Sequence, residues 1–387
     1  MRAHAPNSDI TGEDGDAVKT APAVLTIDLD ALAANYRFLR DRAAPAECAA
    51  VVKADAYGLG VDKVAPVLWN EGCRSFFVAT LGEALTLRAL LPEAIIYVFD
   101  GLLPGTAPVF AENAIRPVLN SADEIAEWAA FCAETGAKHP AAIHIDTGMN
   151  RLGLSGHELE QFLDGKTDTS AFALTLVMSH LACADTPEHP ANAAQQTRFA
   201  QAISRLPQVT ASLANSGGVV MGADYHFDLV RPGIALYGGQ PSEACEHRFQ
   251  TVVTLSCRIL QIREAGAGET VGYGATKTLQ APTRIATIAA GYADGLSWLL
   301  SAGDAVDGLH AYLGPHAAPI LGRVSMDLVT LDVTGIPETH AKRGAFAEVI
   351  GPNVPLETLA GHASTVNYEV LTNICRRALR RFIGGEG

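Results

Sequence analysis

Residues 49–80 have the sequence AAVVKADAYGLGVDKVAPVLWNEGCRSFFVAT, which contains the repeating unit of the fold. Two short apolar runs, 49–54 and 75–80, flank a stretch at 61–72 whose apolar residues recur at three- and four-residue spacing. Short apolar runs of this length are typical of buried strands, and the recurring spacing is typical of an amphipathic helix. The segment therefore predicts a strand, a helix and a second strand parallel to the first.

The same alternation continues from about Ala23 to Gly238. Further amphipathic stretches occupy 82–91, 121–136 and 191–206. A total of about eight strand and helix units predicts a closed (β/α)₈ barrel. The remaining apolar runs, which we expect to be its other strands, are 94–99, 115–119, 141–146, 174–180, 211–215 and, less regular, 234–238.

The chain changes in texture after Gly238. β-branched runs punctuated by glycine and proline, without long amphipathic helices, predict a second, mainly β domain. The polar opening stretch has too few apolar residues to offset the entropy of ordering it. The expected organisation is a disordered tail over residues 1–21, a (β/α)₈ barrel over 22–245, and a β-strand domain over 246–387.

Composition is typical of a globular protein that acts on small molecules. Hydrophobic residues make up 48% of the 387 residues, and a net charge of -14 argues against binding of nucleic acid. The seven cysteines are scattered without a C-x-x-C pair, so we expect reduced thiols in a cytoplasmic protein and no metal site. We expect no membrane contact either, because no apolar stretch reaches the length of a span.

Functional side chains of such a barrel belong at the carboxyl ends of its strands. The first strong strand ends at Lys53, and Tyr57 follows in a loop that contains glycine. A lysine at the end of a buried strand loses hydration energy unless it is paired or gives up its charge in a covalent bond. The ordinary alternative is a lysine whose amine reaches solvent, and Lys53 alone does not decide between them.

Other predicted strand ends also carry polar side chains. Arg151 lies in the loop after one strand and His180 ends the next. Residues 214–218, ANSGG, precede a helix, where they could form a simple turn with a helix cap or offer backbone amides to a phosphate. Arg231 and Gly233 follow, and glycine allows a close approach of the backbone to a ligand.

Eight motifs together carry a resemblance to bacterial alanine racemases, which are pyridoxal-phosphate enzymes of fold type III. The resemblance extends over nearly the whole chain from about residue 22, and it implies the barrel and the β domain described above. Each motif alone is weak evidence, but all occur in the family's order. They are AVVKADAYGLG (50–60), DTGMNRLG (146–153), ANSGG (214–218), VRPGIALYG (230–238), VGYGAT (271–276), AAGYADG (289–295), GRVSMD (322–327) and VNYEV (366–370).

The resemblance implies roles for individual residues in a pyridoxal 5'-phosphate site. Lys53 would hold the cofactor covalently and act as one catalytic base, and Tyr273 would be the other. Arg231 would face the pyridine nitrogen, and His180, also at the cofactor, would link Tyr273 to Arg231 by hydrogen bonds. Arg151 would reach the cofactor's phenolic oxygen and the substrate carboxylate. The cofactor phosphate would meet Tyr57, Asn215, Ser216, Gly233, Ile234 and Tyr368, and the substrate would also meet Met326, Tyr292 and Asp327.

The implied reaction is the racemisation of L- and D-alanine, which would supply D-alanine for peptidoglycan. It removes the α-proton from one face and returns one to the other, so it needs two acid/base groups on opposite faces. Lys53 would serve the D face and Tyr273 the L face. Arg231 would keep the pyridine nitrogen unprotonated and so favour quick reprotonation over side reactions. The resemblance also implies that Tyr273 enters the site of a partner subunit, so we expect a homodimer.

The chain departs from the family pattern at three places. Many members have a carboxylated lysine where this chain has His144, and histidine forms no comparable carbamate, so we expect no modified residue there. The alternative interpretation is that His144 only packs within a strand. Ser325 stands where relatives often have cysteine, with slight expected effect. The segment LSWLLS (296–301) is more apolar than the arginine-containing segment of relatives, which could alter substrate range or subunit pairing.

Three other functions remain open at this point. A decarboxylase of the same architecture is disfavoured by Arg231, because those enzymes present a carboxylate to the pyridine nitrogen. A racemase that accepts many amino acids is harder to distinguish from an alanine racemase, because the width of the pocket depends on loops whose positions the sequence does not predict. A non-catalytic pyridoxal-phosphate-binding protein is disfavoured by the second domain with Tyr273, because a binder needs no second base.

Overall fold

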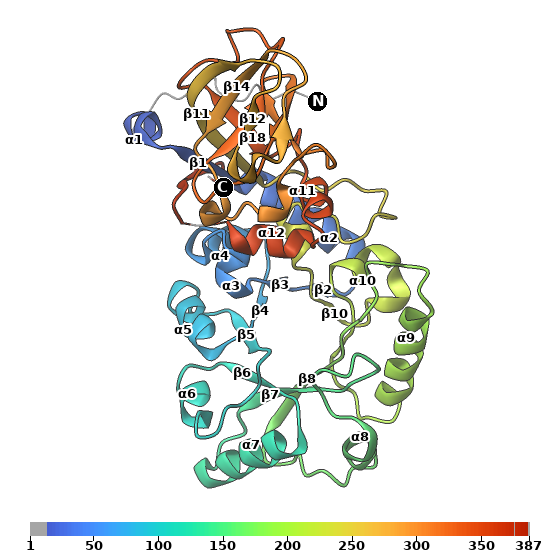
Figure 1. Ribbon diagram of the computed structural model, residues 1–387. Helices are drawn as coiled ribbons and strands as arrows, with labels where there is room; N and C mark the ends of the chain where they lie inside the picture. Colours follow the sequence, from blue (N-terminus) through green and yellow to red (C-terminus); the bar gives the residue numbers. More distant parts are fainter. Residues whose placement is uncertain (1–13, 375, 386–387) are drawn as a thin grey trace. The chain divides into compact units, whose positions relative to one another are not determined.

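The computed structural model describes residues 14–374 and 376–385, which form two compact units (Figure 1). The barrel unit comprises residues 32–250. The β unit comprises the residues up to Ala31 together with those from Thr251 onward. The two units meet at residues 250 and 251, a few residues after the expected boundary at 245 and 246.

Seven parallel strands form the main sheet of the barrel unit, each hydrogen-bonded to the next. In order they are β3 (Ala50–Val51), β4 (Ser75–Val78), β5 (Ile95–Val98), β6 (Arg116–Leu119), β7 (Pro140–His144), β8 (Ala173–Met178) and β9 (Ala211–Ser212). An eighth strand, β10 (Leu229–Val230), pairs in parallel with β2 (Glu47–Cys48), which leads directly into β3.

Backbone hydrogen bonds complete the ring on both sides of β10. Asp228 and Arg231 donate their N–H groups to the carbonyls of Ala211 and Ala214, at 3.0 and 2.9 Å, which joins β10 to the β9 side. Val51 donates to the carbonyl of Pro232 at 3.0 Å, which joins it to β3. The eight-stranded parallel barrel that the sequence predicts is confirmed.

The helices of the barrel unit surround these strands (Figure 1). The four helices predicted from amphipathic spacing are present as α4 (Val61–Asn70), α5 (Leu81–Leu90), α7 (Ala122–Thr135) and α9 (Pro190–Ile203). In α7, the Ser121 side chain accepts from the N–H of Glu124 at 3.2 Å, and Gly136 ends the helix in the left-handed conformation. The others are α2 (Leu29–Ala43), α3 (Lys53–Tyr57), α6 (Ala107–Glu112), α8 (Gly156–Leu163), α10 (Ser216–Met221) and the 3₁₀ turn η1 (Ala223–Tyr225).

The expected strand at 234–238 is wrong. Residues Ile234–Tyr237 form a buried 3₁₀ turn, η2, which ends at Gly238 with φ 86°. A short apolar run that is buried on all sides has no periodicity that distinguishes a strand from a helix, so its sequence does not predict the 3₁₀ turn. The eighth strand lies earlier, at β10.

The β unit is built on an eight-stranded sheet of mainly antiparallel pairs. Its order is β14 (Thr283–Ile288), β17 (Val329–Asp332), β16 (His316–Leu321), β15 (His310–Leu313), β18 (Phe346–Ile350), β11 (Val253–Ala265), β1 (Ala23–Asp28) and β19 (Leu379–Ile383). The long strand β11 pairs with β18 along one half and with β14 along the other, so six strands close into a ring. The predicted β domain is confirmed.

Shorter elements complete the β unit. They are the hairpin β12 (Thr270–Val271) and β13 (Lys277–Thr278), the helices α1 (Asp14–Thr20), α11 (Leu356–His362) and α12 (Asn367–Asn373), and the 3₁₀ turns η3 (Tyr273–Ala275), η4 (Tyr292–Asp294) and η5 (Trp298–Leu300). Three of the predicted site residues lie in these elements: Tyr273 in η3, Tyr292 in η4 and Tyr368 in α12.

The N-terminal part of the chain differs from the expected tail and barrel. Strand β1 belongs to the β unit, because it pairs antiparallel with β11 and parallel with β19. Within the expected tail of residues 1–21, residues 14–20 form α1 and Ala21 is buried, whereas residues 1–13 lie outside the described residues. Val18 is buried in a cluster with Val24, and Arg258 donates to its carbonyl at 2.6 Å. These contacts offset the conformational entropy that is lost when residues 14–20 become ordered, so the disorder predicted from their polar composition does not occur there.

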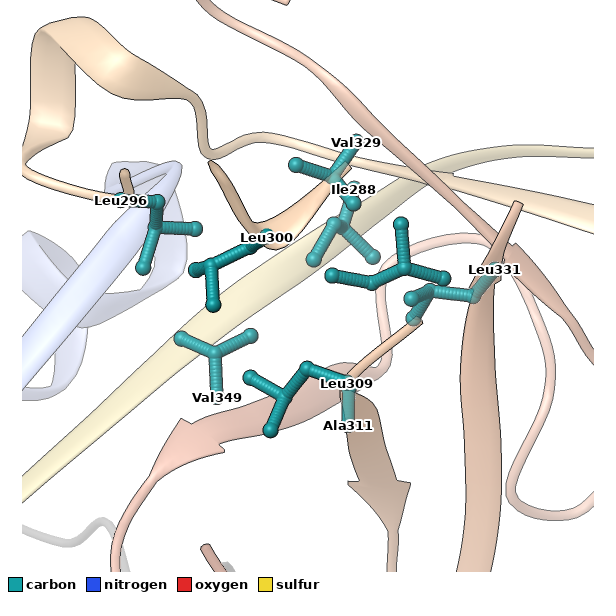
Figure 2. Close-up of a pocket in the computed structure, with 9 residues that line it drawn as sticks. Ile288, Leu296, Leu300, Leu309, Ala311, Val329, Leu331 and Val349 are labelled. Carbon is teal, nitrogen blue, oxygen red and sulfur yellow. The ribbon is translucent and has the colours of Figure 1, made fainter. Parts of the chain in front are cut away.

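The interior of the β unit contains a pocket lined by aliphatic side chains (Figure 2). The residues lie on strands β14 to β18 and on the segment around η5; they are Ile288, Leu296, Leu300, Leu309, Ala311, Ile320, Val329, Leu331 and Val349. Such a lining offers a ligand no hydrogen bond, so the pocket belongs to the hydrophobic core.

Leu331→Ala should lower the free energy of unfolding by about 3 kcal/mol, because it removes a fully buried side chain and enlarges this pocket. Urea unfolding, read from the midpoint at constant slope, measures the loss. Leu328→Ala is the control, since Leu328 is 40% exposed and its truncation should cost less than about 0.5 kcal/mol. Equal losses in the two variants would contradict this account of the core.

Candidate active site

Lys53 begins a left-handed turn at the carboxyl end of β3. Ala54, Asp55, Ala56 and Tyr57 all have φ between 54° and 56°, a region that costs L-residues about 1–2 kcal/mol each. Hydrogen bonds hold the turn: Gly58 N–H donates to the Ala54 carbonyl at 2.7 Å, and Val61 N–H donates to the Asp55 carboxylate at 2.8 Å. A strained backbone held in this way is common at functional sites.

The Lys53 amine lies over the ring of Phe99, 5.7 Å from its centroid, at the end of β5. Burial lowers the pKa of Lys53, and the nearby Arg151 guanidinium lowers it further. The carboxylates of Glu83 and Asp100 act in the opposite direction. The amine therefore gives up its proton more readily than an exposed lysine, as a nucleophile or base requires.

Arg231 is buried at the end of β10, with 2% of its surface exposed. Its guanidinium donates to the Ser179 carbonyl at 2.6 Å, to the Leu213 carbonyl at 3.4 Å and to the Ser212 hydroxyl. Desolvation lowers its pKa to about 9, so it stays cationic at neutral pH. Its Nε is buried and finds no hydrogen-bond partner among the described residues. A buried donor in this state is costly unless a ligand supplies the acceptor.

The segments around α10 and η2 gather four of the predicted phosphate-binding residues next to Tyr57. The Ser216 hydroxyl accepts from the N–H groups of Gly233 at 2.8 Å and Ala235 at 3.4 Å, and Asn215 caps α10 by accepting from Gly218 N–H at 3.0 Å. A Cβ built on Gly233 would overlap the Tyr57 hydroxyl. Only glycine therefore fits there, and the buried backbone of Ile234 follows it.

His180 and His144 are both held neutral. Desolvation and the cations Arg231 and Arg151 lower the pKa of His180 well below its ordinary value. Desolvation, together with Arg231, lowers the pKa of His144 to about 4, and its Nδ1 lies 2.9 Å from the Asn120 side-chain oxygen. The Asn120 amide nitrogen donates elsewhere, so His144 is the donor in this bond.

The expected hydrogen bond between His180 and Arg231 is not formed. Arg231 instead donates to the Ser179 carbonyl and the Ser212 hydroxyl at the ends of β8 and β9. His180 is held through its backbone, since its carbonyl accepts from Gln195 at 2.8 Å. Arg151 is exposed in a loop that Asp146 shapes by accepting three successive N–H groups, those of residues 148–150.

The remaining predicted residues lie in the β unit. Tyr273 is 71% exposed in the β12–β13 hairpin, between Gly272 and Gly274, which both have φ near 75°. Tyr292 and Met326 are neighbours, because Tyr292 N–H donates to the Ser325 carbonyl and Ala293 N–H to that of Met326, each at 3.0 Å. These residues and Tyr368 lie in the β unit, whereas Lys53 lies in the barrel unit.

Two further exposed residues of the β unit, Asp327 and Trp298, each contact an arginine. Asp327 pairs with Arg377 at 2.8 Å, and the exposed Trp298 lies under the guanidinium of Arg323 at 5.6 Å. A Cβ on Gly274 would meet that guanidinium at 3.0 Å, so Arg323 packs against the residue after Tyr273.

Sequence reasoning missed several residues that support the site: Glu83, Asn120, Gln195 and Arg323. Glu83 carried a detectable signal, because Thr80 and Glu83 have the spacing of a capping box at the start of α5. The others act through contacts between segments distant in sequence, such as Asn120 with His144. No local pattern predicts such contacts.

Two kinds of feature are absent from the described residues. No helix in residues 14–374 and 376–385 is long and apolar enough to cross a membrane. Within the same ranges, histidine, cysteine and carboxylate side chains form no group of three that could hold a metal ion.

A parallel barrel with a lysine and a buried arginine at its strand ends, followed by a β unit, defines a class of two-domain barrel enzymes. Residues 27–241 match the family model of the alanine racemase N-terminal domain, and residues 252–382 match that of the C-terminal domain. The chain belongs to the alanine racemase family, whose members are isomerases.

Individual relatives agree over almost the whole chain. The chain is 48% identical to an alanine racemase of Rhodospirillum rubrum, covering 94% of this chain and 96% of the relative, and 46% identical to one of Brucella canis, covering 94% of each. The solved alanine racemase of Bartonella henselae, with covalently bound pyridoxal phosphate, is 40% identical with a TM-score of 0.89, covering 94% of this chain and all of that one. A biosynthetic alanine racemase of Pseudomonas aeruginosa is 31% identical with a TM-score of 0.85, at the same coverage.

His144 should make the protein lose stability as the pH falls. Its pKa is about 4 when folded and 6.5 when unfolded, so the unfolded chain takes up a proton that the folded state rejects. Stability is full above pH 6.5 and falls by about 3 kcal/mol by pH 4 from this residue. His144→Gln should lose correspondingly less across that window in urea titrations. The control His157→Gln, an exposed histidine on α8, should follow the wild-type curve; if His144→Gln does so too, the buried neutral state is wrong.

Proposed function

We propose that the chain racemises L- and D-alanine with pyridoxal 5'-phosphate, using Lys53 and the Tyr273 of a second copy as opposed proton-transfer groups. The observation that carries the proposal is the juxtaposition, on adjacent strands, of an amine with a lowered pKa and a buried arginine whose Nε has no acceptor among the residues that the structure describes. Membership of the alanine racemase family supports the same reaction. We further propose a cytoplasmic enzyme that supplies D-alanine for peptidoglycan.

The residues of the barrel unit fit the proposed cofactor. The partnerless Nε of Arg231 can donate to a ring nitrogen, which accepts through its lone pair. Tyr57, Asn215, Ser216, Gly233 and Ile234 form a cradle of hydroxyl and backbone groups, and α10 contributes its N-terminal amides. Such groups suit a phosphate. When bound, the cofactor withdraws electrons from the substrate's α-carbon and so makes its proton acidic.

Lys53 and Arg231 would divide the work at the barrel mouth. Lys53 would hold the cofactor and, once released by substrate, move the α-proton on the D face. Its lowered pKa leaves more of the amine unprotonated at neutral pH. Arg231 can only donate hydrogen bonds, so it would leave the ring nitrogen without a proton, which limits electron withdrawal and favours rapid return of a proton to the α-carbon.

Tyr273 would serve the L face from a second copy of the chain. Its exposed ring lies on the β unit, which also exposes the neighbouring Tyr292 and Met326, and large exposed side chains of this kind suit an interface between subunits. The backbone N–H of Met326, which has no acceptor in the described part of the chain, would bind the substrate carboxylate together with Arg151. Tyr292 and Asp327 would line the approach.

Tyr273→Phe should separate the two proton transfers. Racemisation should fall in both directions by roughly 10²–10⁴-fold, because each turnover uses both groups. Exchange of the α-hydrogen with heavy water should persist for D-alanine, which Lys53 serves, and disappear for L-alanine. Proton magnetic resonance of each enantiomer measures the exchange. Full exchange of L-alanine by the variant would refute the assignment of Tyr273.

Mixing two inactive variants should restore activity if the site is shared between subunits. Lys53→Ala and Tyr273→Phe homodimers each lack one group in every site. In an equal mixture refolded together, half the dimers are mixed and one of their two sites is intact, so about a quarter of wild-type activity should return. The control is each variant refolded alone. A mixture no more active than the variants alone, while mass spectrometry shows mixed dimers, would exclude donation of Tyr273 across the interface.

A further inference from the structure

The turn after Lys53 needs support from outside itself. Four consecutive residues without glycine occupy the left-handed region, and the hydrogen bonds within the turn offset only part of that cost. A segment under such strain relaxes unless the surrounding structure holds it. The turn is therefore expected to be held by a side chain from another element.

Glu83, at the start of α5, binds this turn directly. One carboxylate oxygen accepts from the N–H of Ala54, the residue after Lys53, at 2.7 Å. The other oxygen accepts from the N–H groups of Ala79 at 2.8 Å and Thr80 at 3.3 Å, where β4 passes into α5. The Thr80 hydroxyl accepts from Glu83 N–H at 3.2 Å and so fixes Glu83 in turn. One carboxylate thus joins the lysine's turn to the neighbouring strand end.

We infer that Glu83 is a positioning residue for Lys53, which holds the amine where it can transfer the proton on the D face. Hydrogen bonds from backbone N–H groups to a carboxylate are among the stronger ones in proteins. The bond to Ala54 lies one residue from Lys53, so a shift of this peptide moves the side chain that precedes it. This inference rests on the proposed function of Lys53.

The charge of Glu83 acts on Lys53 as well. The charged groups around the amine are Arg151 in the loop after β7, Asp100 after β5 and Glu83 on α5, with the neutral His180 after β8. Glu83 raises the pKa of Lys53 against the effects of burial and of Arg151. Glu83→Gln should therefore lower the pKa of Lys53 further and move the pH profile of D-face exchange toward lower pH.

Glu83→Gln should slow α-hydrogen exchange of D-alanine by about tenfold to a hundredfold, the effect of misplacing a reacting group by about an ångström. Exchange of L-alanine, which Tyr273 serves, should change less than about threefold. Both rates are measured on the holoenzyme at saturating pyridoxal phosphate, so any loss of cofactor affects them equally. Glu83→Asp keeps the charge but shortens the side chain, and it should be intermediate; it also provides the test if Glu83→Gln does not fold.

The chain contains a matched control. Glu124 occupies the same place in α7, where it follows the cap Ser121 and accepts from the N–H groups of Asn120 at 3.0 Å and Leu102 at 3.2 Å. No reactive lysine lies next to these amides. Glu124→Gln should therefore alter both exchange rates equally or not at all.

Three outcomes separate the hypotheses. Wild-type enzyme that exchanges neither enantiomer would overturn the proposed function itself. Normal wild-type exchange with equal loss for both enantiomers in Glu83→Gln, or no loss, would overturn only the positioning role. A selective loss for D-alanine in Glu83→Gln but not in Glu124→Gln, with the pH profile moved to lower pH, would support it.

Discussion

The backbone hydrogen bonds that close the barrel determine the rest of the site. Val51 donates to the carbonyl of Pro232, and Ala49 donates to that of Val230 at 2.9 Å. These two bonds align the strand that ends before Lys53 with the strand that ends before Arg231. Residues almost 180 positions apart in the chain are thereby brought to the same edge of one sheet. Without this closure, the amine and the guanidinium would belong to the two free edges of an open sheet.

Burial and the cations at that edge together set the protonation of their neighbours. Desolvation lowers the pKa of His180 and of His144, and Arg231 and Arg151 lower both further, so each imidazole is held in its neutral form. Burial also lowers the pKa of Lys53, and Arg151 adds to this effect, which keeps the amine closer to its basic form. Arginine suits this role because it keeps its charge where lysine or histidine would lose it. The two arginines thus tune the titratable groups around them, and Arg231 stays cationic at neutral pH even with its pKa lowered to about 9.

Much of this arrangement could be predicted from the sequence because it depends on local patterns. The spacing of apolar residues predicts the helices α5 and α7, and the end of the first strong apolar run predicts the place of Lys53. Arg231 precedes the run expected as the last strand, so its predicted role comes from the family motif and not from a strand end. Strand β1 was assigned to the wrong unit, since its partners β11 and β19 lie more than 200 residues away and no local pattern records them. The sequence predicts a strand where η2 forms, because a fully buried segment has no polar positions that would show a helical or a strand periodicity. The bond of His144 to Asn120 was missed for the same reason as β1: its partner is set by the register of separate strands.

The places where the barrel unit breaks ordinary rules lie around one point. Four residues without glycine take left-handed conformations after Lys53, a guanidinium nitrogen is buried without a partner, and Gly233 leaves no room for a side chain against Tyr57. Each feature costs stability in the isolated chain, and a fold under selection for stability alone would remove them. These features lie together at the carboxyl ends of β3, β9 and β10, and the proposed cofactor would supply an acceptor to the Arg231 Nε, for which the described residues offer none. The left-handed turn after Lys53 is held by the protein itself, through hydrogen bonds within the turn and through the Glu83 carboxylate, which accepts from the Ala54 N–H. Its support therefore does not depend on a bound cofactor, as the inferred positioning role of Glu83 requires.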